Sequence, residues 1–86
     1  MGLLNQVLGT KMMDAAACLS ELDALDVMVL SVDLDTAIPV LRVQPAKGLH
    51  RLTGAWKRSR RVEGGQLKEL YRGNLAKCFV EWEVRP

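Results

Sequence analysis

The most regular pattern in the sequence lies in residues 67–84, LKELYRGNLAKCFVEWEV. The last third of this stretch alternates, and one side of the alternation is apolar: Cys78, Val80, Trp82 and Val84. A period of two residues is typical of a strand with one buried and one solvated face. We therefore expect a strand here, against which the rest of the chain packs.

Gly73-Asn74 lies between this strand and a second strand-like run, which favours a hairpin turn at that dipeptide. Pairing through a two-residue turn there sets Glu69 opposite Cys78, on the face predicted to be buried. A longer loop over residues 73–77 would relieve that conflict, so the register stays open.

A helix is predicted over residues 10–25, where Thr10 is a suitable N-cap and Asp14 lies near the first turn. Apolar residues recur there at helical spacing and form one stripe: Met12, Ala15, Ala16, Leu19 and Leu22. Residues 1–9 either extend this helix through Gly9 or form a flexible arm.

Residues 27–34 alternate again and predict a second strand, whose apolar side comprises Met28, Leu30, Val32 and Leu34. After a turn at residues 35–37 the chain returns over residues 38–44, and the two runs predict an antiparallel hairpin. Pro39 cannot donate to a strand ladder, so the returning strand begins there or runs along a sheet edge.

The following segment, residues 46–54, predicts a loop with a short helical turn that uses Leu49 and Leu52. Residues 63–66 predict a turn around their Gly-Gly pair. Residues 66–72 fit a short helix or a strand, and the strand is preferred because seven residues make a marginal helix.

These elements predict a single α+β domain over residues 1–86, with an N-terminal helix packed on a four- to five-stranded antiparallel sheet. The expected core comprises Leu19, Leu22, Met28, Leu30, Val32, Leu41, Val43, Trp56, Leu67, Cys78, Val80 and Trp82. An apolar fraction of 49% and a charged fraction of 26% are those of an ordinary globular domain and argue against global disorder. No apolar run approaches the ~20 residues that span a bilayer, and no signal peptide is evident, so we expect a cytoplasmic protein without a membrane partner.

The residues that carry chemistry are few. Cys18 and Cys78 are expected to be reduced thiols, although their spacing leaves a disulfide open. His50 is the single histidine, and the chain has no CxxC pattern, so we expect no metal and no other cofactor. Asp33 and Asp35 are read as turn acids. Without an acid–base or nucleophile constellation, we expect neither an enzyme nor a small-molecule substrate.

The net charge of +2 conceals an asymmetry between the two halves of the chain. Residues 1–46 hold two basic and six acidic residues, a net charge of −4. Residues 47–86 hold ten basic and four acidic residues, a net charge of +6. Halves of opposite sign can neutralise each other within one fold, or they can form two faces, one of which suits an acidic partner.

The most unusual local composition is a basic run beside a tryptophan, comprising Trp56, Lys57, Arg58, Arg60 and Arg61. Three interpretations stay open. The run can be a solvated strand whose charges discourage edge pairing. It can bind an acidic protein partner, or a second copy in a homodimer, because arginine grips carboxylates through two hydrogen bonds. An open sheet edge is the alternative surface for such a protein interaction. It can also bind nucleic acid, with its cations on phosphates and its indole stacked on a base.

Residues 38–84 resemble small uncharacterised proteins encoded by phages and prophages of proteobacteria. The resemblance rests on Val43-Gln44-Pro45, on Gly54-Ala55-Trp56, and on Cys78 with Val80-Glu81-Trp82. It implies a viral origin, a cytoplasmic setting in a bacterial host cell, and an accessory role in which the protein binds a host protein.

Overall fold

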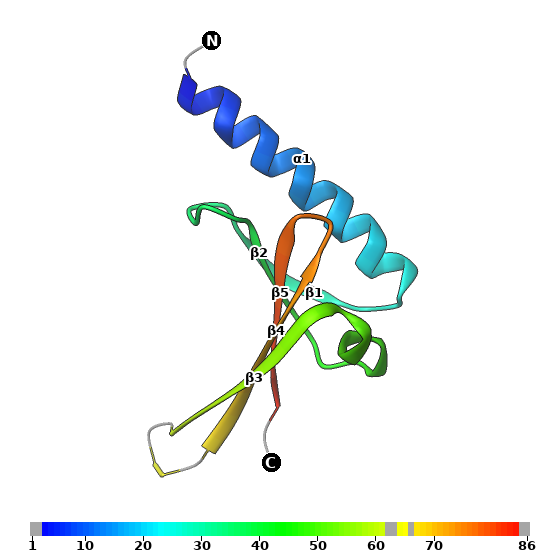
Figure 1. Ribbon diagram of the computed structural model, residues 1–86, viewed down its shortest axis with the longest axis vertical. Coiled ribbons are helices and arrows are strands. Elements are labelled where there is room, and N and C mark those ends of the chain that lie inside the picture. Colours follow the sequence, from blue (N-terminus) through cyan, green and yellow to red (C-terminus); the bar gives the residue numbers. More distant parts are fainter. Residues whose placement is uncertain (1–2, 62–63, 66, 85–86) are drawn as a thin grey trace.

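The computed structural model describes residues 3–61, 64–65 and 67–84, and at residues 3–4, 50–51, 53, 55–61 and 67 it describes the backbone alone. The elements in chain order are α1 (Leu3–Ala24), β1 (Val29–Asp33), β2 (Val40–Val43), the 3-10 helix η1 (Lys47–Arg51), β3 (Thr53–Arg61), β4 (Leu67–Leu75) and β5 (Cys78–Val84). The strands form one sheet in the order β1-β2-β5-β4-β3, and α1 crosses it obliquely (Figure 1). The predicted α+β class, with an N-terminal helix on the sheet, is confirmed.

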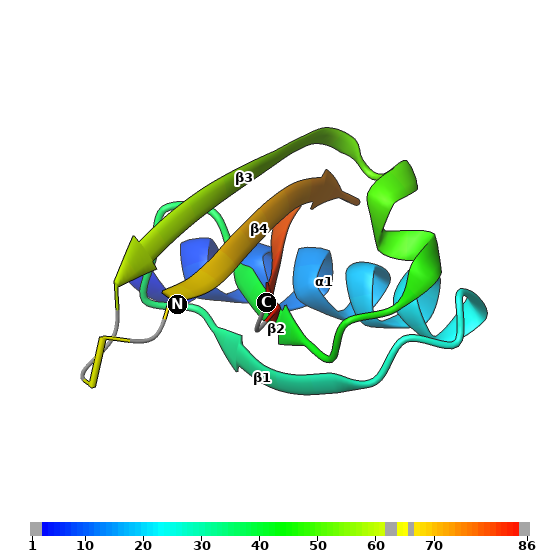
Figure 2. The same ribbon diagram turned by 90° about the horizontal axis from the view of Figure 1, so that it is seen from below.

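The expectation of a wholly antiparallel sheet is wrong at one pair. Strands β2 and β5 are parallel, with Leu41 opposite Val80. The chain leaves β2 through η1, builds the antiparallel meander β3-β4-β5 from the far margin inward, and so returns beside β2 in the same direction. The sheet is strongly curved, with β1 and β3 at its two margins (Figure 2).

The β4–β5 turn lies three residues later than predicted. Gly73 and Asn74 belong to β4, and the turn is made by Ala76 and Lys77, with φ of 49° and 64°. Positive φ at both central positions is the mark of a two-residue hairpin turn that follows the strand twist. The shift also removes the register conflict, because Glu69 now lies opposite Val84.

Helix α1 begins at Leu3 and runs through Gly9, so the predicted N-cap at Thr10 is wrong. The Thr10 hydroxyl instead donates to the Gln6 carbonyl oxygen within the helix, at 3.1 Å. The predicted apolar stripe is correct at only two positions. The side chains that face the sheet are Ala15, Cys18 and Leu22, whereas Met12, Ala16 and Leu19 are exposed.

Six of the predicted core residues are buried: Leu22, Leu41, Val43, Cys78, Val80 and Trp82. Leu19, Met28, Leu30 and Val32 are exposed, so these four predictions are wrong. The side chains of Trp56 and Leu67 lie outside the described part of the structure. The error at β1 has a simple cause: this strand is a sheet margin, so apolar alternation there does not ensure that a second layer covers it.

Three of the other predicted elements are confirmed, whereas the turn predicted at residues 63–66 lies partly outside the described residues. The hairpin of β1 and β2 is antiparallel, and β2 begins just after Pro39. The short helical turn is η1, whose Leu49 is fully buried and is followed by buried Leu52. Residues 67–75 form a strand rather than a helix.

Candidate functional site

The predicted partner-binding residues lie on β3, at one margin of the sheet: Trp56, Lys57, Arg58, Arg60 and Arg61. Strand β3 pairs with β4, and Arg60 lies opposite Lys68. This pair lies beyond Glu69 and Val84, the last β4–β5 pair among the described residues. The segment thus lies on a hairpin that extends away from α1 (Figure 1). The side chains of these five residues lie outside the described part of the chain, so this site stays a prediction.

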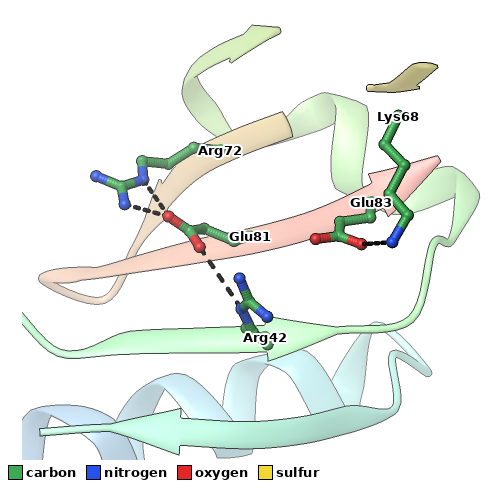
Figure 3. Close-up of polar contacts among 5 residues, drawn as sticks. All are labelled: Arg42, Lys68, Arg72, Glu81 and Glu83. Carbon is green, nitrogen blue, oxygen red and sulfur yellow. Dashed lines mark hydrogen bonds and ion pairs between the residues drawn. The ribbon is translucent and has the colours of Figure 1, made fainter. Parts of the chain in front are cut away.

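The sheet face opposite α1 carries a network of charged side chains centred on Glu81 (Figure 3). Arg72 donates from Nε to Glu81 Oε1 at 2.7 Å and makes a second hydrogen bond from Nη2 to the same oxygen. Arg42 Nε lies 3.9 Å from the other carboxylate oxygen. The Glu81 side chain is 9% exposed, although the alternation of β5 predicted a solvated position.

Cationic side chains in and beside this network make two further contacts. Lys68 Nζ lies 3.6 Å from Glu83 Oε2, and the Arg72 guanidinium carbon lies 4.5 Å from the centre of the Phe79 ring. Because these cations face carboxylates of the same chain, this part of the sheet offers a distant anion a weak net field. Arg42 is the more solvated arginine of the network, with 55% of its side chain exposed.

A shallow hollow of about 260 Å³ lies on the same face, between Leu30 and Leu70. Its polar lining comes from Arg42, Glu81 and Glu83. Arg42 pairs with Glu81, and Glu83 pairs with Lys68. Paired carboxylates without a nearby nucleophile or histidine among the lining residues give the hollow no evident acid–base chemistry.

The most unexpected surface is apolar and lies at the other margin of the sheet. The exposed large hydrophobic residues of the described chain all fall between positions 7 and 38: Val7, Leu8, Met12, Met13, Leu19, Leu25, Met28, Leu30, Val32 and Ile38. Four of them gather around β1, and we define the β1 edge surface as Leu19, Met28, Leu30 and Val32. Met28 and Leu30 are 62% and 60% exposed.

Contacts and register show how this surface is built. Leu19 of α1 and Met28 line one open hollow of about 520 Å³, between the helix and the start of β1. Val32 pairs with Leu41, on the α1 side of the sheet, while Leu30 lines the hollow on the opposite side. Apolar side chains therefore flank the free edge of β1 on both faces.

Acidic residues surround the β1 edge surface. Asp23 and Asp26 line the hollow that Leu19 and Met28 share. At the other end of β1, the Asp35 amide donates to Asp33 Oδ1 at 2.9 Å, which closes a local turn. Asp33 thus has a structural contact within its hairpin, as expected of a turn acid.

Cys18 of α1 and Cys78 of β5 are free thiols buried in the same core, where they interact with each other. Burial, with smaller contributions from Cys78 and Glu21, raises the pKa of Cys18 from 9.0 to about 12. Burial also raises the pKa of Cys78. A protonated, inaccessible thiol is a poor nucleophile, so the pair is a packing contact at neutral pH.

Within residues 3–61, 64–65 and 67–84, no three His, Cys, Asp or Glu side chains gather where they could hold a metal ion. The same part of the chain has no helix that is long and apolar enough to span a bilayer. No family model, curated protein or solved structure matches this chain.

Proposed function

We propose that this chain is a non-catalytic interaction protein that binds another protein through the β1 edge surface. The observation that carries the proposal is the exposure of Leu30 on a strand that has no neighbour on its outer side in the described chain, together with that of Met28 just before this strand. Exposed apolar patches commonly mark interaction sites, and Leu19 and Met28 line one hollow beside this strand. A free strand edge adds unpaired backbone donors and acceptors to that patch.

The resemblance to phage and prophage proteins supports an accessory role in a bacterial cell. In that setting the partner is a host protein or a second copy of the chain. The acidic residues beside the patch, Asp23, Asp26 and Asp33, favour a partner whose contact region is basic.

The basic segment at residues 57–61 supports a second candidate function, the binding of nucleic acid. It is favoured by the position of the segment on the projecting β3–β4 hairpin, at the free margin of the sheet. One observation argues against nucleic-acid binding: the neighbouring cations Lys68 and Arg72 already contact Glu83 and Glu81. Phosphate binding would therefore depend on this five-residue segment without help from Lys68 and Arg72.

A capture experiment from bacterial lysate distinguishes the two candidates. The tagged protein is compared with Leu30→Asp and with Arg58→Glu/Arg60→Glu, in lysate with and without nuclease. Met13→Asp is the matched control, because Met13 is 75% exposed on a part of α1 that lines none of the hollows at β1.

We expect a protein that is captured by the wild type and by Met13→Asp, lost with Leu30→Asp, and insensitive to nuclease. Capture that disappears with nuclease and with the arginine variant would favour nucleic acid instead. If Leu30→Asp captures the same proteins as the wild type, the β1 edge surface is not the binding site.

A further inference from the structure

We infer that the β1 edge of one copy binds the β3 edge of a second copy, so that the chain assembles head to tail. This inference rests on the proposed function, because it takes the β1 edge surface as the docking surface. It adds the identity of the occupant, namely the basic margin of the same protein.

The first argument is charge complementarity between the two margins. The strand β1 ends in Asp33, and Asp26 and Asp35 flank it in sequence. The strand β3 carries Lys57, Arg58, Arg60 and Arg61 in its sequence. Two β1 edges repel each other, and so do two β3 edges, whereas a β1 edge attracts a β3 edge.

The second argument is strand direction. In the sheet order β1-β2-β5-β4-β3, three pairs are antiparallel and the β2–β5 pair is parallel, so β1 and β3 run in opposite directions. A second copy in the same orientation would place its β3 antiparallel to β1 and continue the sheet. No reversal of the second copy is needed.

The third argument is the need to cover apolar surface on both faces of β1. A strand added at this edge would shield Leu30 on one face and Val32 on the other, which are now 60% and 40% exposed. The β1–β2 register is irregular between Val29 and Ser31, which limits regular pairing to the end of β1. Backbone pairing over so short a run is weak, and the charges and apolar contacts must supply the rest of the affinity.

The symmetry of such a contact determines how the mass of the assembly depends on concentration and salt. A head-to-tail interface leaves one free β1 edge and one free β3 edge on every assembly, so growth continues until a ring closes. The average mass should rise with concentration beyond twice the 9.6 kDa of one chain. It should fall when salt is raised from ~50 mM to ~500 mM, because salt screens the contact between the charged margins.

Charge reversal in sedimentation velocity tests the inference. We expect Asp33→Lys or Arg60→Glu alone to weaken self-association by about tenfold. The two substitutions in one chain should restore it, as should a mixture of the two single variants. Glu21→Lys, the same charge change on an exposed helix position, is the control and should change little. Circular dichroism confirms that each variant folds.

Three outcomes would overturn the inference: a single-chain mass at all concentrations in low salt, a plateau at twice that mass, or no restoration by the combined reversal. If the chain stays monomeric while Leu30→Asp still abolishes capture from lysate, the proposed function stands and the occupant is another protein. Failure of both experiments would remove both proposals.

Discussion

Gly73 and Leu52 approach each other so closely that no larger residue fits at position 73. A Cβ placed on Gly73 would lie 2.8 Å from Leu52 Cβ, and Gly73 itself is buried in β4. Leu52 follows η1, so the glycine allows this connection to pack directly on the sheet. The glycine that the sequence suggested for a turn is therefore needed for packing.

We expect Gly73→Ala to lower the free energy of unfolding by about 1–3 kcal/mol, because the added methyl group overpacks the core. Urea denaturation followed by tryptophan fluorescence measures this change. Gly48→Ala is the control, since no atom lies within 4 Å of a Cβ at that position. Leu52→Gly in the same chain removes the Cβ that makes the closest approach and should relieve part of the overpacking, so strictly additive effects of the two substitutions would contradict the contact.

Removal of the Glu81 carboxylate should destabilise the protein by about 2 kcal/mol, because Arg72 would lose both of its charged hydrogen bonds in a partly buried site. Glu81→Ala tests this by thermal or urea denaturation. Glu83→Ala should cost less than about 1 kcal/mol, since its pair with Lys68 is more solvated. Equal losses for the two variants would show that the burial of Glu81 contributes nothing.

The exposed leucine of β1 and the buried leucine of α1 should respond very differently to truncation. Leu22→Ala should lower the free energy of unfolding by about 2–5 kcal/mol, because Leu22 is fully buried. Leu30→Ala should change it by less than about 1 kcal/mol, since Leu30 is largely solvated. Comparable losses in urea denaturation would place Leu30 in the core and remove the basis of the β1 edge surface.

Alkaline pH should destabilise the fold through the buried thiols. The pKa of Cys18 rises from 9.0 to about 12 on folding, so the folded state holds this proton more tightly than the unfolded state. Its contribution to stability is complete below pH 9 and is lost as the pH rises toward 12, with a slope of up to about 1.4 kcal/mol per pH unit.

Urea denaturation at several pH values between 8 and 11 measures this loss. The stability of Cys18→Ala should decline less steeply than that of the wild type over the same range, because this variant lacks the thiol whose pKa is raised to about 12. Identical slopes for the two proteins would show that Cys18 does not carry the effect.

The local patterns predicted most of the elements but not how they meet. Alternation in β5 identified Cys78, Val80 and Trp82 as buried, because central strands are covered where their apolar side faces a helix. The same alternation failed at Leu30, because a strand at a sheet margin has the same sequence period as a central strand.

The prediction of which face of α1 is buried was wrong for a related reason. Small residues such as Ala16 fit a buried or an exposed position equally well, so the stripe did not specify which flank of α1 faces the sheet. Cys18, which the stripe omitted, is fully buried. The parallel β2–β5 pair has no local signature, since it depends on the route of the chain through η1 and the meander.

The sequence predicted the composition of the candidate site but not its position in the fold. The basic run was evident, and the structure assigns it to a margin of the sheet. The sequence did not reveal the β1 edge surface, because the alternation of residues 27–34 predicts a buried position for most of its residues. The sequence of β1 has apolar residues flanked by acids, and a strand that starts after a proline follows it. This pattern does not show whether another layer covers β1.

The parallel pair also bears on how the chain folds. It aligns Val40 with Phe79, 39 positions apart, whereas the β4–β5 hairpin closes through Ala76 and Lys77 alone. Closing the longer loop carries the larger entropic cost, so the local hairpins should form before β2 and β5 join. We therefore expect the joining of β2 and β5 to limit the folding rate, with substitutions at Leu41 slowing folding more than substitutions in β1.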